Sequence, residues 1–210
     1  LLVGDALLFK GFMLLQKAVN DLSAKKMTQI FNVISSMFFE LGDAEALELK
    51  LQGSMNVKPQ EYLSIVKMKA ADIEACARIG AILGNASEKQ INAIGKYGRI
   101  LGTILILRDE LADVADYEEA LHRIKNEPLP LPILYALQNS EAKSKIISLL
   151  SKKKKGKKDI EKIVKIVSKY RIIDKFTEIY HNMSSRGYAY IQPLPYNTNL
   201  KLLLDAATLL

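Results

Sequence analysis

Apolar residues recur along most of the chain at the three- and four-residue spacing that places them on one face of an α-helix. No stretch alternates apolar and polar positions for long enough to predict a β-strand. The pattern therefore predicts an all-α protein. The stripes consist of Leu7, Leu8, Phe12, Leu15 and Val19; Ile30, Ile34, Met37, Phe38 and Leu41; Leu63, Val66, Ile73 and Ala77; Ile94, Tyr97, Leu101, Leu105 and Leu111; and Ile160, Ile163, Val164 and Val167.

Proline and serine mark several helix boundaries. Pro59 suits the first turn of a helix and predicts one that contains residues 62–83 without a break. Ser87 is a suitable N-cap for a second helix, which we expect to reach Arg108. The prolines within residues 128–132 interrupt the helical pattern, and the next helix is expected to start near Pro132.

Small residues occupy more than one face of the predicted central helices, notably the alanines within residues 70–81. Such helices pack on several neighbours at once. Gly98 and Gly102 predict a close contact between helices, because glycine weakens a helix interior unless packing requires it. No period of 30 to 50 residues recurs. We therefore expect one large bundle, with residues 1–210 forming a single domain.

Composition agrees with a globular chain, since 49% of its 210 residues are apolar and 25% are charged. No apolar run reaches the roughly 18 residues that span a bilayer. The apolar N-terminal segment is broken by Asp5 and Lys10, so we do not interpret it as a signal peptide. The single cysteine, Cys76, predicts a buried, reduced thiol and a cytoplasmic protein.

The net charge of +7 is compatible with a nucleic acid, a membrane surface or a phosphorylated small molecule as partner. Residues 152–158 (Lys-Lys-Lys-Lys-Gly-Lys-Lys) are expected to form a solvated loop between two helices. They lack interleaved aromatic residues and any nucleic-acid-binding motif, so we expect no nucleic-acid partner. Peripheral contact with an anionic membrane is the alternative function for Lys152 to Lys158.

Acidic residues follow the apolar helical stretch at residues 100–107. Asp109 and Asp113 are four residues apart and share a helix face, and Glu110 can join them from the side. Like charges at this spacing repel each other, so a cation would stabilise them. Carboxylates combined with substrate phosphates are the ligands that suit Mg²⁺. From these residues alone, a magnesium site and an ordinary solvated acidic turn both remain open.

Two lysines, Lys67 and Lys69, lie on a predicted helix whose other positions are mostly small or apolar. A lysine in this setting is a candidate phosphate ligand that acts as a point charge. An ordinary surface lysine is the alternative interpretation.

Several segments together resemble the trans-isoprenyl diphosphate synthases, the polyprenyl synthetase family. Residues 3–8 (Val-Gly-Asp-Ala-Leu-Leu) are similar to the family's Gly-Asp-x-Leu-Leu, and residues 62–69 to its Tyr-Leu-x-x-Ile-x-x-Lys-Thr. Residues 80–86 resemble its Gly-Ala-x-Leu-x-x-Ala, and residues 97–113 its approach to the second aspartate-rich motif. Residues 130–137 (Pro-Leu-Pro-Ile-Leu-Tyr-Ala-Leu) match a further segment, so the resemblance runs in order from residue 3 to about 137.

The chain also departs from the family pattern. The usual Asp-Asp-x-x-Asp is Asp-Glu-x-x-Asp here, and the preceding Phe-Gln is Leu105-Ile106. Glu45 replaces a glutamine, and Ala70 replaces the threonine after the family's lysine. The familiar Gly-Lys loop after the second motif is replaced by residues 122–127. This set of variants resembles archaeal-type members.

The resemblance implies an isoprenoid synthase bundle of long helices around a central cavity, usually dimeric, so we expect a homodimer. It implies a prenyltransferase that condenses isopentenyl diphosphate with an allylic diphosphate, assisted by Mg²⁺, to give a longer trans-polyprenyl diphosphate such as farnesyl or geranylgeranyl diphosphate. Carried over to this chain, it assigns metal binding to Asp109, Glu110 and Asp113, diphosphate binding to Lys69, Arg123 and Lys125, and positions near the cavity to Glu45 and Tyr97.

Family members also carry a first aspartate-rich motif upstream of the Gly-Asp-x-Leu-Leu segment. The chain begins at that segment, so we expect a domain without its N-terminal helices. A non-catalytic subunit of a heteromeric synthase is the main alternative, favoured by the changes at Glu45, Ala70 and Leu105-Ile106. A terpene cyclase is less consistent with residues 130–137. In this family, the chain length of the product depends on residues near the first aspartate-rich motif.

Overall fold

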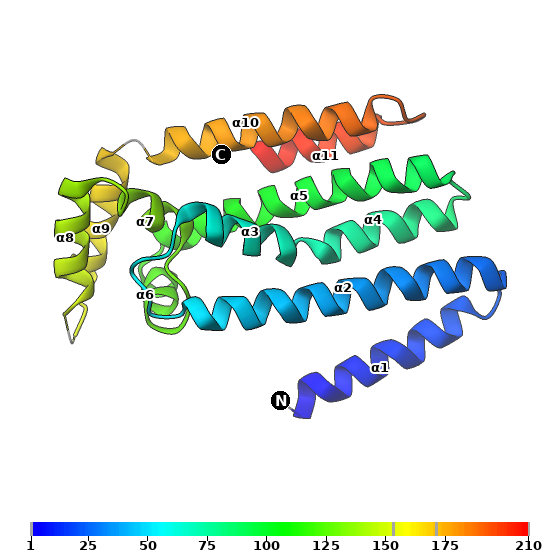
Figure 1. Cartoon of the computed structure of the whole chain (residues 1–210), viewed down its shortest axis with the longest axis horizontal. Coiled ribbons are helices and arrows are strands. Elements are labelled where there is room, and N and C mark those ends of the chain that lie inside the picture. Colours follow the sequence, from blue (N-terminus) through cyan, green and yellow to red (C-terminus); the bar gives the residue numbers. More distant parts are fainter. Residues whose placement is uncertain (1, 153, 171, 210) are drawn as a thin grey trace.

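The chain folds into helices joined by short connections (Figure 1). The computed structural model describes residues 2–152, 154–170 and 172–209, and within these ranges no strand forms. The predicted all-α class is confirmed. The helices are α1 (Leu2–Val19), α2 (Ala24–Leu51), α3 (Pro59–Lys69), α4 (Ala71–Leu83), α5 (Glu88–Ala115), α6 (Tyr117–Asn126), α7 (Leu131–Ala136), α8 (Ser140–Leu150), α9 (Lys157–Lys169), α10 (Ile172–Ile191) and α11 (Thr198–Thr208).

The long helices run side by side along the long axis of the molecule, and α5 lies at their centre (Figure 1). α5 packs against α3 and α4 on one side and against α10 and α11 on the other. α2 covers α3 and α4, and α1 folds back beside α2. The short helices α6 to α9 close one end of the bundle, where the acidic motif of α5 also lies.

Side-chain caps set the predicted helix starts. Ser87 accepts a hydrogen bond from the Gln90 N–H, while the Gln90 side chain accepts one from the Ser87 N–H, which completes a capping box. Pro59 occupies the first turn of α3, where its missing N–H has no cost. Both predictions are confirmed. α5, however, continues beyond the expected end at Arg108 and reaches Ala115.

The predicted continuous helix over residues 62–83 is wrong, because it breaks at Ala70. Ala70 has φ −75° and ψ 10°, outside the range of a regular α-helix, and it separates α3 from α4. Arg99 from α5 donates to the carbonyls of Lys67, at 2.8 Å, and Met68, at 3.3 Å. These bonds satisfy acceptors at the end of α3 that a continuing helix would otherwise pair.

Glycines allow α4 and α5 to approach closely, as predicted. A Cβ atom at Gly98 would lie 2.9 Å from the Ile73 carbonyl oxygen and 3.0 Å from the Glu74 Cα. At Gly102 it would lie 2.9 Å from the Ala70 Cβ. Backbone and short side chains cannot move away from such contacts, so both positions require glycine in this packing.

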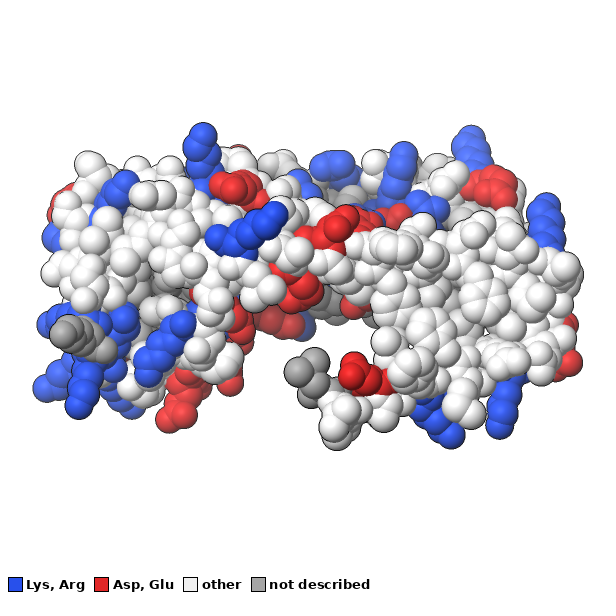
Figure 2. Space-filling model, turned by 60° about the horizontal axis from the view of Figure 1, so that its bottom comes forward, with Lys and Arg blue, Asp and Glu red and all other residues white. Residues whose placement is uncertain are grey.

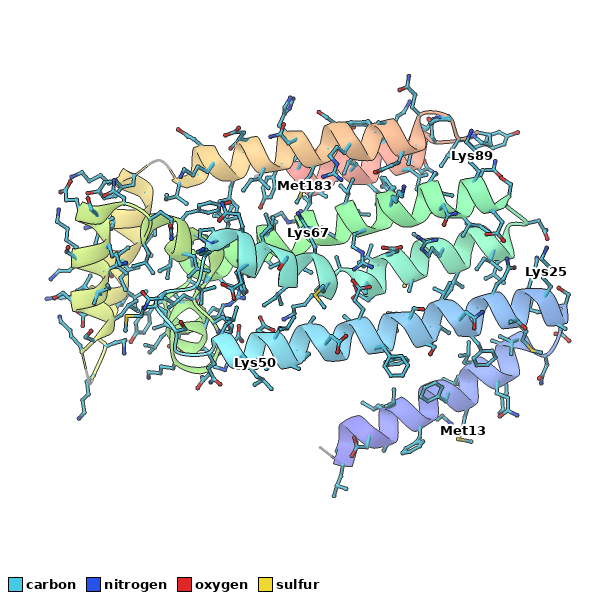
Figure 3. The ribbon with its side chains drawn as sticks, viewed as in Figure 1. Met13, Lys25, Lys50, Lys67, Lys89 and Met183 are labelled. Carbon is cyan, nitrogen blue, oxygen red and sulfur yellow. The ribbon has the colours of Figure 1, made fainter. Side chains whose placement is uncertain are left out.

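Two groups of buried apolar side chains hold the helices together. The larger group joins α3 to each helix from α5 to α11, and the smaller lies between α2, α4 and α5. Figure 3 shows Met183 of α10 directed into the larger group, whereas Met13 of α1 points away from α2. Fully buried members of the larger group include Tyr62, Tyr97, Leu107 and Phe176.

Two smaller predictions have different outcomes. Cys76 was expected to be buried, but its free thiol is exposed, because α4 turns this position away from α2 and α5. The basic run connects two helices only in part, since α8 ends at Leu150 and α9 already starts at Lys157, so Lys157 and Lys158 form the first turn of α9; Lys153 lies outside the described residues. None of the described helices is both long enough and apolar enough to cross a bilayer.

Candidate active site

The acidic motif lies in the last two turns of α5, and its middle carboxylate points in a different direction from the other two. Asp109 is exposed, and the side chain of Asp113 retains 33% of its exposure. Glu110 is 1% exposed. One residue advances a helix by 100°, so Glu110 turns from the outer face toward the core. The pair four residues apart therefore shares an accessible face, as predicted.

Glu110 is held inside the bundle by three donors. The Tyr62 hydroxyl donates to Oε1 at 2.5 Å, the Leu131 N–H donates to Oε2 at 3.1 Å, and Arg123 Nη2 lies 3.3 Å from Oε1. These contacts join α5 to α3, α6 and α7. Both oxygens are engaged and shielded, so this geometry does not suit the metal-binding role expected of Glu110.

Burial dominates the electrostatics of this carboxylate. It raises the pKa of Glu110, and the charge of Arg123 and the hydrogen bonds from Tyr62 and Leu131 reduce that rise without cancelling it. Burial, followed by the adjacent Glu110, raises the pKa of Tyr62 far above its ordinary value. The phenol therefore keeps its proton and remains a donor to Glu110.

Arg123, expected as a diphosphate ligand, is surrounded by carboxylates. Its Nη1 donates to Asp113 Oδ2 at 2.8 Å, and its Nε lies 3.0 Å from Glu127 Oε2. Burial lowers the pKa of Arg123, but the charges of Glu110, Glu127 and Asp113 outweigh burial and raise it overall. The guanidinium is thus a permanent counter-charge beside the acidic motif. Lys125, the other expected ligand on α6, is exposed.

Lys69, at the end of α3, faces α2. Its Nζ donates to Glu48 Oε2 at 2.6 Å and lies 3.5 Å from Glu45 Oε1. Burial lowers the pKa of Lys69, but the hydrogen bond and charge of Glu48, with help from Glu45, raise it overall. The ammonium therefore stays charged at neutral pH. Glu45 is well exposed, so it is the weaker partner.

Glu48 is a residue that the sequence pattern did not single out. Its side chain is 10% exposed. Its charge also contributes to the raised pKa of Tyr62 and of Glu110, so the Lys69–Glu48 pair and the Glu110 cluster belong to one electrostatic unit. Its position three residues after Glu45, on the same face of a predicted helix, was the available signal.

Two buried tyrosines lie on the long helices of the bundle. Tyr97, expected near a cavity, is 2% exposed, and its hydroxyl donates to the Leu200 carbonyl at 2.6 Å, so it fastens α11 to α5. Tyr180, not selected from the sequence, lies on α10 near the acidic motif. Burial, and then the charge of Glu110, raises the pKa of Tyr180, with a smaller contribution from Asp109.

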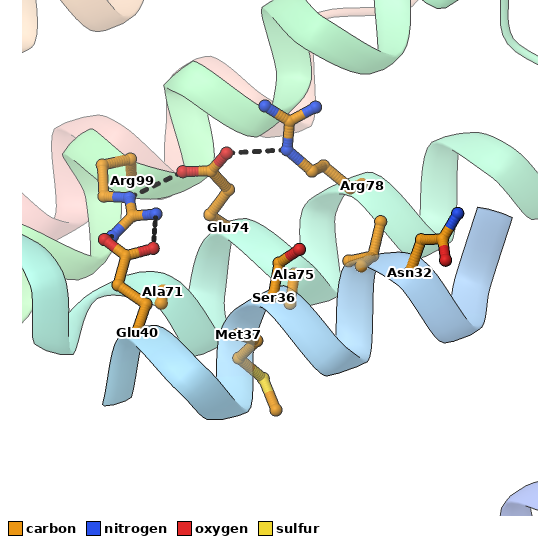
Figure 4. A pocket seen from close by; sticks show the side chains of 10 residues that line it. Asn32, Ser36, Met37, Glu40, Ala71, Glu74, Ala75, Arg78 and Arg99 are labelled. Carbon is orange, nitrogen blue, oxygen red and sulfur yellow. Dashed lines mark hydrogen bonds and ion pairs between the residues drawn. The ribbon is translucent and has the colours of Figure 1, made fainter. Parts of the chain in front are cut away.

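A polar pocket of about 320 Å³ lies between α2 and α4. Arg99 reaches it from α5 and pairs with both oxygens of Glu40, at 2.6 and 2.8 Å, and with Glu74 at 2.6 Å (Figure 4). Arg78 completes the network through Glu74 at 2.6 Å. The same Arg99 holds the end of α3, so this network is coupled to the position of Lys69.

Among the described residues, no group of three or more His, Cys, Asp or Glu side chains is arranged to enclose a metal ion. Within the acidic motif, the accessible carboxylates are Asp109 and Asp113. Mg²⁺ is commonly held by one or two carboxylates together with substrate phosphates, so two carboxylates fit an ion that arrives with a diphosphate.

Comparison with known proteins agrees with this architecture. The chain is 30% identical over 130 residues to the geranylgeranyl diphosphate synthase of Methanosarcina mazei, covering 61% of this chain and 40% of that protein. It is 24% identical over 199 residues to the short chain isoprenyl diphosphate synthase of Methanothermobacter thermautotrophicus, covering 93% and 57%. It therefore spans about half the length of these relatives.

The fold is shared with solved structures. A decaprenyl diphosphate synthase from Rhodobacter capsulatus superposes with a TM-score of 0.82 at 20% identity, covering 99% of this chain and 65% of that one. The family model described as polyprenyl synthetase matches residues 1–167. With four-fifths of its length inside that match and the bundle in place, this chain belongs to the polyprenyl synthetase family.

Proposed function

We propose that the complete protein is a trans-prenyltransferase. It would condense isopentenyl diphosphate with an allylic diphosphate and produce a longer trans-polyprenyl diphosphate, such as farnesyl or geranylgeranyl diphosphate. The observation that carries the proposal is the accessible Asp109–Asp113 pair at the end of α5, together with a charged lysine on α3, a helix that packs against α5, in a chain of this family. The relatives named as diphosphate synthases support it.

Asp109 and Asp113 are the residues we assign to Mg²⁺. A bound Mg²⁺ would offset the negative charge that develops on the departing diphosphate. Glu110 is excluded from this role, because its oxygens face Tyr62 and the Leu131 N–H. Instead it fixes the orientation of α5 and thereby the direction in which the two aspartates point.

Lys69 is the residue we assign to the diphosphate. Glu48, at 2.6 Å, holds the ammonium in place, while Glu45, at 3.5 Å and exposed, makes a contact that an incoming anion can replace. A charge-assisted hydrogen bond from Lys69 to a phosphate oxygen would orient the substrate. Arg123 acts differently: it neutralises Asp113, and Glu127 and Glu110 retain the guanidinium when Asp113 takes another cation.

We also propose that the protein is a homodimer, formed through α1 and α2. These helices expose many large apolar side chains, and monomeric proteins rarely leave so continuous an apolar surface uncovered. A measured mass of one chain for the complete protein, by light scattering, would overturn this proposal. The exposed side chains are Leu2, Val3, Leu7, Leu8, Phe9, Phe12, Met13, Leu14, Phe31, Phe38 and Phe39.

Residues 1–210 would act as one domain, because α5 contacts helices from both halves of the chain. A cytoplasmic location fits the free, exposed thiol of Cys76, since reducing compartments keep thiols unpaired.

A non-catalytic subunit that shapes the cavity of an active synthase is the second candidate. The observation in its favour is that Glu110 faces the core and Arg123 occupies Asp113, so Asp109 is the most freely presented carboxylate of the motif. One assay tests both candidate functions. It measures how much labelled isopentenyl diphosphate the complete protein, with Mg²⁺, incorporates into butanol-extractable product. Activity from the protein alone supports the enzyme; activity gained only by mixing with a second synthase supports the subunit.

A further inference from the structure

Positive charge is concentrated in one part of this chain. Residues 140–175 contain thirteen Lys and Arg but four Asp and Glu, whereas the whole chain contains 30 and 23 and has a net charge of +7. The segment therefore carries an excess of nine positive charges, and the remaining residues are slightly acidic. Figure 2 shows a cluster of Lys and Arg side chains at the end of the molecule formed by α8 and α9, whereas those elsewhere on this face are more scattered.

The lysines of α9 are confined to its outer face. Lys158, Lys162, Lys165 and Lys169 follow one another at intervals of four, three and four residues, and all four are exposed. On the opposite face, isoleucine and valine side chains are buried against α6, α7 and α10. The helix is thus fixed with its basic face outward.

An apolar groove runs between this face and α8. It encloses about 580 Å³, and Leu149 and Ile166 provide its apolar lining. Lys145 borders it on α8, and Lys162 and Lys165 border it on α9. The lysine stems can lie along apolar material while their ammonium groups remain at a polar boundary. A groove of this kind fits a molecule that has both a hydrocarbon part and an anionic part.

Internal ion pairs neutralise little of this charge. Lys145 pairs with Glu141 at 2.6 Å, and both side chains are more than half exposed. Lys152 pairs with Asp159 at 2.5 Å. Within the described part of the chain, no carboxylate forms an ion pair with Lys162 or Lys165. The two lysines beside the groove on α9 are therefore available to an external anion.

We propose that α8 and α9 form a docking surface for a bilayer that contains anionic phospholipids. Phospholipid headgroups would contact the lysines, and acyl chains near the interface would contact Leu149 and Ile166. Twelve of the thirteen basic residues are lysine, and the groove lining contains no aromatic residue. Nucleic-acid surfaces instead favour arginine and stacking aromatics. The inference stands independently of the proposed prenyltransferase activity.

Vesicle co-sedimentation tests the surface directly. We expect the protein to bind phosphatidylcholine vesicles with about 30% phosphatidylglycerol roughly tenfold more tightly than pure phosphatidylcholine vesicles, and to lose most of this preference near 0.5 M NaCl. The test variant combines Lys158→Gln, Lys162→Gln, Lys165→Gln and Lys169→Gln. The matched control combines Lys58→Gln, Lys89→Gln, Lys96→Gln and Arg186→Gln, which removes the same charge from exposed positions outside α1, α2, α8 and α9; Figure 3 places Lys89 at the opposite end of the bundle.

The α9 variant should lose the preference for anionic vesicles, and the control should retain it within about twofold, with unchanged far-UV circular dichroism in both. A variant with Leu149→Ser alone should keep salt-sensitive binding but bind less tightly. Equal losses in the α9 variant and the control would mean that net charge alone is responsible and would overturn the proposal. Tighter binding to a single-stranded RNA than to anionic vesicles, lost in the same α9 variant, would assign the surface to nucleic acid instead.

Discussion

Arg123 Nη1 lies 2.8 Å from Asp113 Oδ2, so one of the two accessible carboxylates of the acidic motif already has a positive partner. The same guanidinium contacts Glu110 and Glu127. Asp109 and Asp113 are therefore not equivalent, although the sequence spacing makes them look alike. A cation at Asp113 must compete with Arg123, whereas a cation at Asp109 need not.

The first prediction concerns both aspartates, since both are assigned to the Mg²⁺ site. Asp109→Asn and Asp113→Asn should each lower turnover of the complete protein by at least about tenfold, because each removes a carboxylate from the Mg²⁺ site. Far-UV circular dichroism should not change, since both side chains are at least one-third exposed. Steady-state kinetics over a range of Mg²⁺ concentrations checks this. Wild-type turnover in both variants would identify the motif as a solvated turn.

Glu110→Gln distinguishes structural support from metal binding. The amide can still accept from Tyr62, but it loses an acceptor for the Leu131 N–H or for Arg123. We expect a loss of about 1–3 kcal/mol in the free energy of unfolding, measured by chemical denaturation. The Mg²⁺ concentration for half-maximal turnover should stay within about twofold of wild type, because Glu110 does not reach the outer face. A large increase in that concentration would restore Glu110 as a ligand.

Lys69→Ala should weaken diphosphate binding by about 1.5–3 kcal/mol, because it removes a charge-assisted hydrogen bond. Calorimetric titration with inorganic diphosphate and Mg²⁺ measures this. Lys67→Ala, on the same helix and exposed, is the matched control and should bind diphosphate normally.

Neutralising Lys152 to Lys155 together should leave turnover of soluble short substrates intact. The opposite pattern, with loss in the loop variant and not in Lys69→Ala, would mean that the phosphate site is misplaced.

Tyr97 provides a prediction for the dependence of stability on pH. Burial, with smaller effects of Tyr188 and Asp205, raises the pKa of Tyr97 from 10.0 to about 12. The unfolded chain ionises first, so the contribution of Tyr97 to stability is complete below pH 10 and is lost as pH rises toward 12. The advantage of wild type over Tyr97→Phe, from denaturation at several pH values, should therefore shrink over this range. A constant difference would contradict the buried phenol.

Local sequence patterns were sufficient to predict most of the helices and their caps. Ser87 and Gln90 are three residues apart, and Gly98 and Gly102 lie one turn apart, so their roles follow from near neighbours. The break at Ala70 could not be found in this way. It depends on Arg99, which lies about thirty residues further along the chain and contacts the end of α3 through tertiary packing.

The candidate active site was likewise predictable only where it depends on residues that are close in sequence. The spacing of Asp109 and Asp113 indicated their shared face. The inward direction of Glu110 is consistent with the helical period, but the buried partners that hold it, Tyr62 and the Leu131 N–H, are separated from it by 48 and 21 residues. Contacts at such separations are set by the packing of whole helices, which residue spacing alone does not determine.

Arg99 carries the last prediction, because it links the polar pocket to the phosphate site. It donates to the carbonyls of Lys67 and Met68, immediately before Lys69, and is itself held by Glu40 and Glu74. Arg99→Gln should therefore allow the end of α3 to move and should weaken diphosphate binding by about fivefold or more through Lys69.

Arg78→Gln is the matched control for Arg99→Gln. Arg78 also pairs with Glu74 at 2.6 Å, but it makes no hydrogen bond to α3 among the described residues. Arg78→Gln should lower the free energy of unfolding by about the same small amount as Arg99→Gln, without changing the affinity for diphosphate. A double-mutant cycle then separates the two roles of Arg99, since Lys69→Ala with Arg99→Gln should bind diphosphate no more weakly than Lys69→Ala alone. If the two losses add, or if Arg99→Gln behaves like Arg78→Gln, Arg99 stabilises the bundle without positioning Lys69.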